Sequence, residues 1–227
     1  MHTEKHFTAS DLIKDIVIGM SDGLTVPFAL AAGLSGAVSS NGIVITAGMA
    51  EIVAGSIAMG LGGYLAAKTE SDHYRSELKR EYDEVETLPD NEIQEVKDVF
   101  REYGIGPVLQ NEIALELSRD KKKWVDFMMR FELGMEEPDE KRASKSAFNI
   151  GFSYIVGGIV PLAGYFFTGN PREGLVISTI VTILFLFVFG YFKTKFTGNK
   201  PLFGALKTVF IGVLAAGAAF FIAKLIS

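Results

Sequence analysis

Five long apolar stretches constrain the fold of this chain more than any other feature of its sequence. A transmembrane helix needs roughly 20 mostly apolar residues to cross about 30 Å of hydrocarbon. The polar remainder of the chain is too small to cover so much apolar surface in a water-soluble protein. The sequence therefore predicts an all-α membrane protein with five transmembrane helices. The predicted spans are Ile16–Val38, Ile43–Ala67, Ala147–Thr168, Leu175–Phe192 and Leu202–Ile226.

Charged residues gather between the second and third of these stretches. Residues 68–145 hold 14 of the 22 Lys and Arg residues and 21 of the 27 Asp and Glu residues. Because acids outnumber and interleave with bases, nucleic acid is not an expected partner. We expect an N-terminal segment with transmembrane helices 1 and 2 over residues 1–67, a cytosolic, acidic, helical metal-binding domain over residues 68–145, and transmembrane helices 3 to 5 over residues 146–227.

The distribution of basic residues predicts the orientation in the membrane, since Lys and Arg are retained on the cytoplasmic side. The connection between the last two spans carries Lys193, Lys195 and Lys200, whereas the turn between spans 3 and 4 carries only Arg172. With five spans, the N-terminus and the acidic domain are then cytosolic, and the C-terminus is on the other side.

Local signals divide the acidic domain into several helices. The second span continues without Gly or Pro as one rod until Leu88-Pro89. Asp90 is the predicted N-cap of a helix over residues 91–103. A last amphipathic helix is predicted over residues 121–134.

Asp22 lies within the first span, where a carboxylate costs about 2.5–3.5 kcal/mol on insertion scales. Pro27 lacks an N–H and frees a backbone carbonyl in the preceding turn, so the two residues predict a polar notch. Intramembrane carboxylates usually face a cavity or a partner, which favours a role in transport. The alternative is that Asp22 lies at the lipid headgroups or only hydrogen-bonds a neighbouring helix.

Glu51 and Met59 lie in the second span, two helical turns apart and rotated by roughly 80°. A carboxylate offsets the dehydration of a divalent ion, and a thioether favours softer transition metals over Ca²⁺ or Mg²⁺. The pair therefore predicts a binding site for a transition metal. For Met59, a flexible apolar gap-filler is the alternative interpretation.

The cytosolic rod carries acids at spacings of seven, four and three, which keeps them on one helix side. Such like charges destabilise a bare helix unless a cation neutralises them, so the pattern is compatible with metal binding. The alternative is a solvated face relieved by Arg75, Lys79 and Arg80. The acids are Glu70, Glu77, Glu81 and Glu84.

Two further groups of candidate ligands follow in the acidic domain. Carboxylate oxygens with thioether sulfur suit Fe²⁺ or a similar first-row ion better than an alkaline earth ion. The alternative places the methionines in the core and the acids on the surface. The candidates are Glu92, Glu95, Met128, Met129 and Glu132.

Several motifs of other protein classes are missing from the sequence. There is no phosphate-binding loop and no nucleophile elbow, so a nucleotide partner and an enzymatic function are not expected. Glu70 and His73 match the Glu-x-x-His element of di-iron bundles, but no second copy exists, and we treat this match as coincidence.

Two runs of sequence resemble the vacuolar iron transporter family, which is related to the yeast calcium cross-complementer transporter. The runs are DLIKDIVIGMSDGLTVP at residues 11–27 and AEIVAGSIAMGLGGYLAAKTESDHY at residues 50–74. With the long acidic insert, the chain looks most like the plant members. The resemblance covers essentially the whole chain.

This resemblance implies a homodimer in the vacuolar membrane that exchanges cytosolic Fe²⁺ for vacuolar protons, with the pathway at the subunit interface and no prosthetic group. It implies transport residues at Asp22, Glu51 and Met59. Glu70 and Glu77 are candidates from helical spacing alone. The implied cytosolic metal ligands are Glu81, Glu84, Glu92, Glu95, Met128, Met129 and Glu132.

The main hypothesis is that the acidic domain collects Fe²⁺ and passes it to a membrane site that exchanges the metal for a proton. A carboxylate in a low dielectric favours its neutral form, so an emptied site should take up a proton. The alternative is a metal-gated cation channel or a membrane-anchored metal sensor without proton coupling. The preference among Fe²⁺, Mn²⁺, Zn²⁺ and Co²⁺ stays open, because selectivity comes from geometry.

Overall fold

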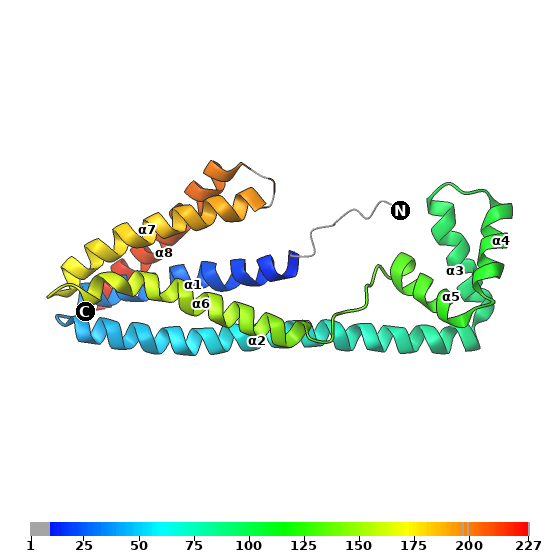
Figure 1. The fold of residues 1–227 in the computed structure, drawn as a ribbon, viewed down its shortest axis with the longest axis horizontal. Coiled ribbons are helices and arrows are strands. Elements are labelled where there is room, and N and C mark those ends of the chain that lie inside the picture. Colours follow the sequence, from blue (N-terminus) through cyan, green and yellow to red (C-terminus); the bar gives the residue numbers. More distant parts are fainter. Residues whose placement is uncertain (1–9, 197, 199, 227) are drawn as a thin grey trace. The chain divides into compact units, whose positions relative to one another are not determined.

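The computed structural model describes residues 10–196, 198 and 200–226, and all regular secondary structure in these residues is helical (Figure 1). The part of the predicted N-terminal segment before Ser10 lies outside the described residues. The helices are α1 (Ser10–Ala37), α2 (Asn41–Thr87), α3 (Pro89–Glu102), α4 (Pro107–Leu117), α5 (Lys121–Phe127), the π-helix η1 (Met128–Glu132), α6 (Arg142–Phe166), α7 (Pro171–Phe196) and α8 (Pro201–Ile226).

Five of the described helices are long and apolar enough to cross a membrane, as predicted. They are α1, α2, α6, α7 and α8. The helix α2 is a single element of 47 residues, which confirms that the second span continues as a rod. The helices α1 and α6 end slightly before the predicted spans, because Gly, Asn and Ser residues follow them and favour turns.

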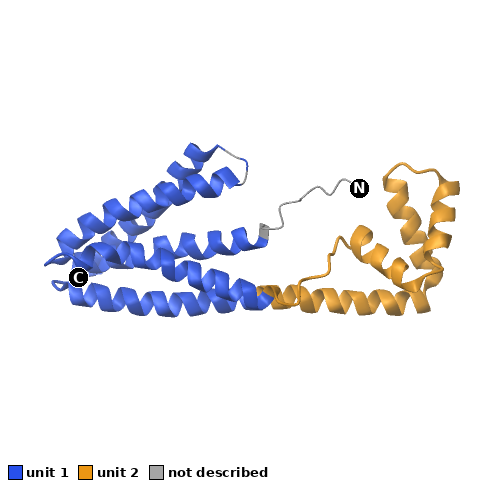
Figure 2. Cartoon of the chain, viewed as in Figure 1, with its two compact units in different colours: residues 1–65, 143–227 blue, residues 66–142 orange. Residues whose placement is uncertain are grey.

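The chain divides into two compact units (Figure 2). The membrane unit comprises residues 1–65 and 143–227, and the acidic unit comprises residues 66–142. The helix α2 contributes residues to both units.

Glycines allow α6 to approach both α1 and α2 in the membrane unit. A Cβ atom at Gly23 of α1 would overlap the backbone carbonyl oxygen of Tyr154 in α6. On α2, a Cβ atom at Gly60 would lie 2.9 Å from the carbonyl oxygen of Ala147. Such small residues let membrane helices pack backbone to backbone. The three helices therefore have little freedom to shift relative to one another.

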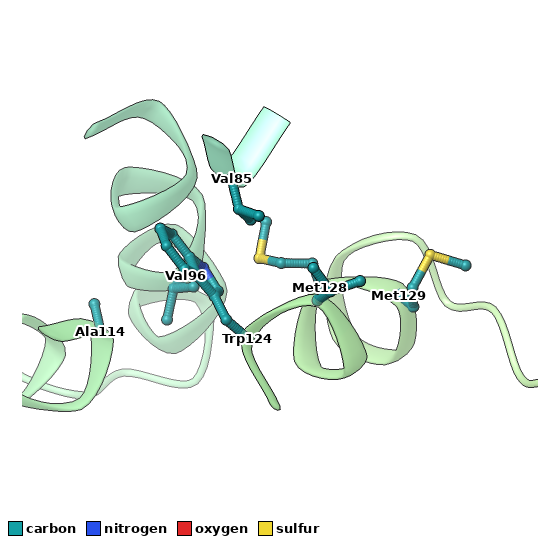
Figure 3. Close-up of a cluster of buried hydrophobic side chains, with 7 residues drawn as sticks. Val85, Val96, Ala114, Trp124, Met128 and Met129 are labelled. Carbon is teal, nitrogen blue, oxygen red and sulfur yellow. The ribbon is translucent and has the colours of Figure 1, made fainter. Parts of the chain in front are cut away.

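The acidic unit has its own apolar core (Figure 3). Trp124 and Val125 of α5 pack with Val96 of α3 and Ala114 of α4, and all four are buried. The helix α3 begins at Pro89, so the predicted N-cap at Asp90 is wrong, because Pro at the first helical position starts the helix earlier.

The predicted last helix over residues 121–134 is also not a uniform α-helix. It is α-helical up to Phe127 and then widens into η1, where the Leu133 N–H donates to the Met128 carbonyl oxygen at 3.1 Å. Such i to i+5 turns are rare and occur frequently at functional sites.

Candidate metal-binding sites

Glu51 of α2 is joined to Tyr154 of α6 in the membrane unit. The Tyr154 hydroxyl donates a hydrogen bond to Oε1 of Glu51. Within the described residues, the other carboxylate oxygen, Oε2, is buried and has no hydrogen-bond partner. Gly55, one turn beyond Glu51, makes room for the tyrosine, because a Cβ atom there would overlap its hydroxyl. Glu51 therefore keeps one buried acceptor that can bind a cation or a proton.

Asp22 lies near the middle of α1, half-buried, and interacts electrostatically with the same Tyr154 hydroxyl. The charges of Asp22 and Glu51 therefore both act on one buried tyrosine. Met59 is half-buried farther along α2. A tyrosine hydroxyl has one hydrogen to donate, and its bond to Glu51 leaves Asp22 available to a cation.

Sequence reasoning missed two polar residues of the membrane unit, Tyr154 and Asp15. Asp15 is only 2% exposed and accepts hydrogen bonds from Ser146 at 3.1 Å and from Asn149 at 3.3 Å. One signal was present in the sequence: Asp15 precedes Asp22 by seven residues, which places both on one side of α1. No comparable signal distinguishes Tyr154 from an aromatic residue facing lipid.

Two carboxylates of the acidic unit are buried. Glu81 of α2 is 2% exposed and Glu92 of α3 is 3% exposed. Each has a buried Oε2 atom without a hydrogen-bond partner among the described residues. Carboxylates are seldom buried unless they are paired or bind a metal, so these two orphaned oxygens mark a candidate cation site.

Further carboxylates surround this pair and change its acidity. Burial first, and then the charges of its neighbours, together raise the pKa of Glu92 to about 7. The neighbouring carboxylates are Glu95, Glu81, Glu84 and Glu132.

The pKa values of Glu132 and Glu95 are raised by the same two causes, burial and neighbouring negative charge. Although part of Glu132 is exposed, desolvation of its carboxyl group raises its pKa to about 7, with Glu95 and Glu81 as the next causes. Burial followed by the charge of Glu84 raises the pKa of Glu95. Acids from α2, α3 and η1 therefore lie near enough to one another to raise each other's pKa values.

Arg80 is the cation that compensates this cluster. Its guanidinium lies 2.8 Å from Glu77, 3.6 Å from Glu81 and 3.3 Å from Glu84. Arg80 was part of the alternative interpretation of the acidic face. It does relieve the acids, but the face is not simply solvated, because Glu81 is buried. Of the two weaker candidates, Glu77 belongs to this network, and Glu70 is exposed.

Met128 and Met129 are 0% and 1% exposed and pack in the core of the acidic unit. Met128 lies beside Val85, and the side chain of Met129 points in a different direction (Figure 3). Core packing agrees with the alternative interpretation, so a role for either sulfur as a ligand stays a prediction. In the part of the chain that the structure describes, no three Asp, Glu or His residues are arranged to hold a metal ion.

Comparisons with known proteins complete the description of these sites. A model of the VIT family matches residues 13–224. The chain is 53% identical over 225 residues to vacuolar iron transporter 1 of Arabidopsis thaliana, covering 99% of this chain and 90% of that protein. It is 52% identical over 223 residues to vacuolar iron transporter 2 of Oryza sativa subsp. japonica, covering 98% and 91%. Protein CCC1 of Saccharomyces cerevisiae is 43% identical over 229 residues, covering 95% and 69%.

Proposed function

The chain belongs to the VIT family, a family of transporters rather than enzymes, and on this premise we propose that it carries ferrous iron into the vacuole in exchange for protons. The observation that carries the proposal is the set of buried carboxylate oxygens without a hydrogen-bond partner among the described residues. Glu51 supplies one in the membrane unit, and Glu81 and Glu92 supply two in the acidic unit. A transported cation is the partner that these oxygens lack.

The membrane site of the proposal consists of Asp22, Glu51 and Met59. Fe²⁺ has the charge for two carboxylates and accepts both oxygen and thioether sulfur. Metal binding requires deprotonated carboxylates, and a low dielectric favours the neutral acid once the metal has left. Protons from an acidic lumen would then reload the site. The same oxygen atoms would bind Fe²⁺ and H⁺ in turn, which couples their movements in opposite directions.

The acidic unit is proposed to be cytosolic and to collect the ion before transport. The proposed ligands are carboxylates that already repel one another, so a divalent cation gains from all of them at once. Because Arg80 bridges three of the acids, an arriving metal ion displaces or shifts that guanidinium. The ligand set consists of Glu81, Glu84, Glu92, Glu95, Met128, Met129 and Glu132, with Glu77 and Glu70 as weaker members.

The proposed assembly is a homodimer with a cytosolic N-terminus and a lumenal C-terminus. A stripe of small residues on α2, Ala54, Ala58 and Gly62, supports the dimer. All three are exposed in the single chain, and a Cβ atom at Gly62 would meet nothing within 4 Å. A second copy could approach this stripe closely.

Proteoliposomes containing the full chain test the proposal directly. With an acidic interior, Fe²⁺ uptake should be accompanied by proton efflux, and a pH indicator and an iron indicator in the same vesicles would record both. The variant Asp22→Ala should lose both signals. Fe²⁺ uptake without proton movement would instead support the metal-gated channel, and undiminished, pH-driven uptake by Asp22→Ala would refute the membrane site.

A matched control separates loss of a ligand from loss of folding. Asp11 is an exposed acid at the start of the same helix, where it lies 3.4 Å from Lys14. Asp11→Ala should transport normally. Replacing Fe²⁺ with Mn²⁺, Zn²⁺ or Co²⁺ in the same assay would establish the metal preference.

A further inference from the structure

A basic cavity lies between the end of α7 and the start of α8, and none of the carboxylates described above lines it. Its volume is about 530 Å³. Three of its eight lining residues are lysines, and none is an acid. The lysines are Lys193 in the last turn of α7, Lys200 before α8, and Lys207 within α8.

The lysine ammonium groups have no carboxylate partner among the described residues, where the ion pairs involve other bases. Lys193 lies over the ring of Phe189, with 5.9 Å between Nζ and the ring centroid. The cavity threonines, Thr194 and Thr208, donate their hydroxyl hydrogens to carbonyl oxygens of their own helices at 2.8 and 2.9 Å. Among the cavity side chains, the donors left for a ligand are therefore three ammonium groups.

Lys207 is the most informative of the three. It lies six residues inside α8 and within the apolar stretch 202–226, close enough to the helix end for its long side chain to reach the headgroup level of a membrane. Near it, Phe203 and Ile211 also line the cavity and are 70% and 51% exposed. The cavity thus combines positive charge with apolar walls that a membrane helix turns toward lipid.

We propose that this cavity binds the phosphate-bearing headgroup of an anionic membrane lipid, with the three lysines on the headgroup and Phe203 and Ile211 along the acyl chains. Phosphate is the ligand that clustered ammonium groups favour, and basic pockets between transmembrane helices bind such headgroups. The apolar walls favour a lipid over a soluble phosphate compound, because they gain only from acyl chains. The inference is independent of the transport function.

Native mass spectrometry of the purified full chain in detergent tests the inference without any metal or pH gradient. The probes are a short-chain phosphatidylinositol phosphate, its soluble inositol phosphate headgroup, and phosphatidylcholine of the same chain length. We expect tight binding of the first probe only. Lys207→Gln should weaken this binding about fivefold, and changing all three lysines should weaken it more than about a hundredfold.

The matched control is Lys195→Gln, which removes the same charge from the same end of α7 but from a residue that does not line the cavity. Binding that is as weak in Lys195→Gln as in Lys207→Gln would overturn the inference, since net charge alone would explain it. Equal affinity for the soluble headgroup would also overturn it in favour of a soluble ligand. Comparing the two single variants does not require the triple variant to fold, and retained binding by Lys207→Arg would support a role for its charge.

Discussion

The buried carboxylates of the two units are compensated in different ways. In the membrane unit, Glu51 accepts a hydrogen bond from the neutral hydroxyl of Tyr154. In the acidic unit, Glu81 lies 3.6 Å from the permanently charged Arg80. A neutral donor lets a carboxyl group change its charge as metal and proton alternate, whereas a guanidinium offsets part of the repulsion within a stack of acids while no metal is bound.

The contrast suggests a division of labour between the units. Under the proposed function, the acidic unit would attract cations from dilute solution, and the membrane unit would exchange one cation for another. Changes in the acidic unit should therefore alter the iron concentration that transport requires, while changes in the membrane unit should alter the maximal rate.

The largest expected effect comes from removing the membrane carboxylate. Glu51→Gln preserves the shape of the side chain but removes its charge, so maximal Fe²⁺ uptake should fall more than about 100-fold. Glu92→Gln in the acidic unit should raise the Fe²⁺ concentration for half-maximal uptake about tenfold and leave the maximal rate unchanged. Initial rates in proteoliposomes across Fe²⁺ concentrations measure both. A lower maximal rate in Glu92→Gln, with unchanged half-saturation, would break the division of labour.

A second prediction concerns the packing that positions Tyr154. A methyl group at Gly23 would overlap the Tyr154 carbonyl oxygen, so Gly23→Ala should destabilise the membrane unit by about 1–3 kcal/mol. Gly217→Ala is the matched control, because it adds the same methyl group to another membrane helix, α8, at a position with nothing within 4 Å. Unfolding in detergent, followed by circular dichroism, compares the two. Similar losses would mean that backbone contact between α1 and α6 does not limit stability.

The apolar segments and the acid spacing predicted much of this arrangement from sequence. Length and composition were sufficient to predict the five membrane helices, because a helix needs a fixed minimum length to cross the hydrocarbon layer. Helical periodicity placed Glu81 and Glu84 on one side of α2, where Arg80 bridges them.

The parts that sequence could not predict depend on contacts between distant segments. The partner of Glu51 comes from α6, 103 residues away, and a tyrosine in an apolar run gives no sign of which neighbour it meets. The π-helical turn at Met128–Glu132 also carries no composition signal, since it differs from an α-helix only in which carbonyl each N–H meets. Burial of Glu81 followed from tertiary packing rather than from its polar sequence neighbourhood.

The third prediction uses pH to sharpen the comparison. Glu92 and Glu132, with pKa values raised to about 7, must lose their protons before they bind metal. Between about pH 7.5 and about pH 6, affinity of the acidic unit should fall about eightfold for each such carboxyl. Isothermal titration calorimetry of the full chain with Mn²⁺ would measure this fall in affinity. Glu132→Gln should lose the part of the fall that comes from Glu132 and keep the part that comes from Glu92.

For the metal-free protein, the same pKa values predict that folding stability falls as pH rises. A raised pKa favours the folded state while the carboxyl is protonated, so this stabilising contribution is fully present below the ordinary value of 4.5 and is lost as pH rises through about 7. Thermal unfolding without metal should therefore show the acidic unit weakening toward alkaline pH, and added Mn²⁺ should restore it there. Weakening toward acidic pH instead would contradict the burial of the Glu92 carboxyl group.

The smallest expected effect is that of Arg80→Gln on metal affinity, and its size should depend on pH. Removing the competing cation frees Glu77, Glu81 and Glu84, which strengthens metal binding at about pH 8 by up to about fivefold, because an exposed ion pair contributes little. At about pH 6 the gain should vanish, since Arg80 also lowers the pKa of Glu132, and its loss leaves that carboxyl more fully protonated. Arg119→Gln, which breaks the exposed pair with Glu116, should change neither affinity. The same titration measures the Mn²⁺ affinity of the unchanged protein and of both variants. If Arg80→Gln and the unchanged protein have equal affinities at both pH values, Arg80 does not compete with metal.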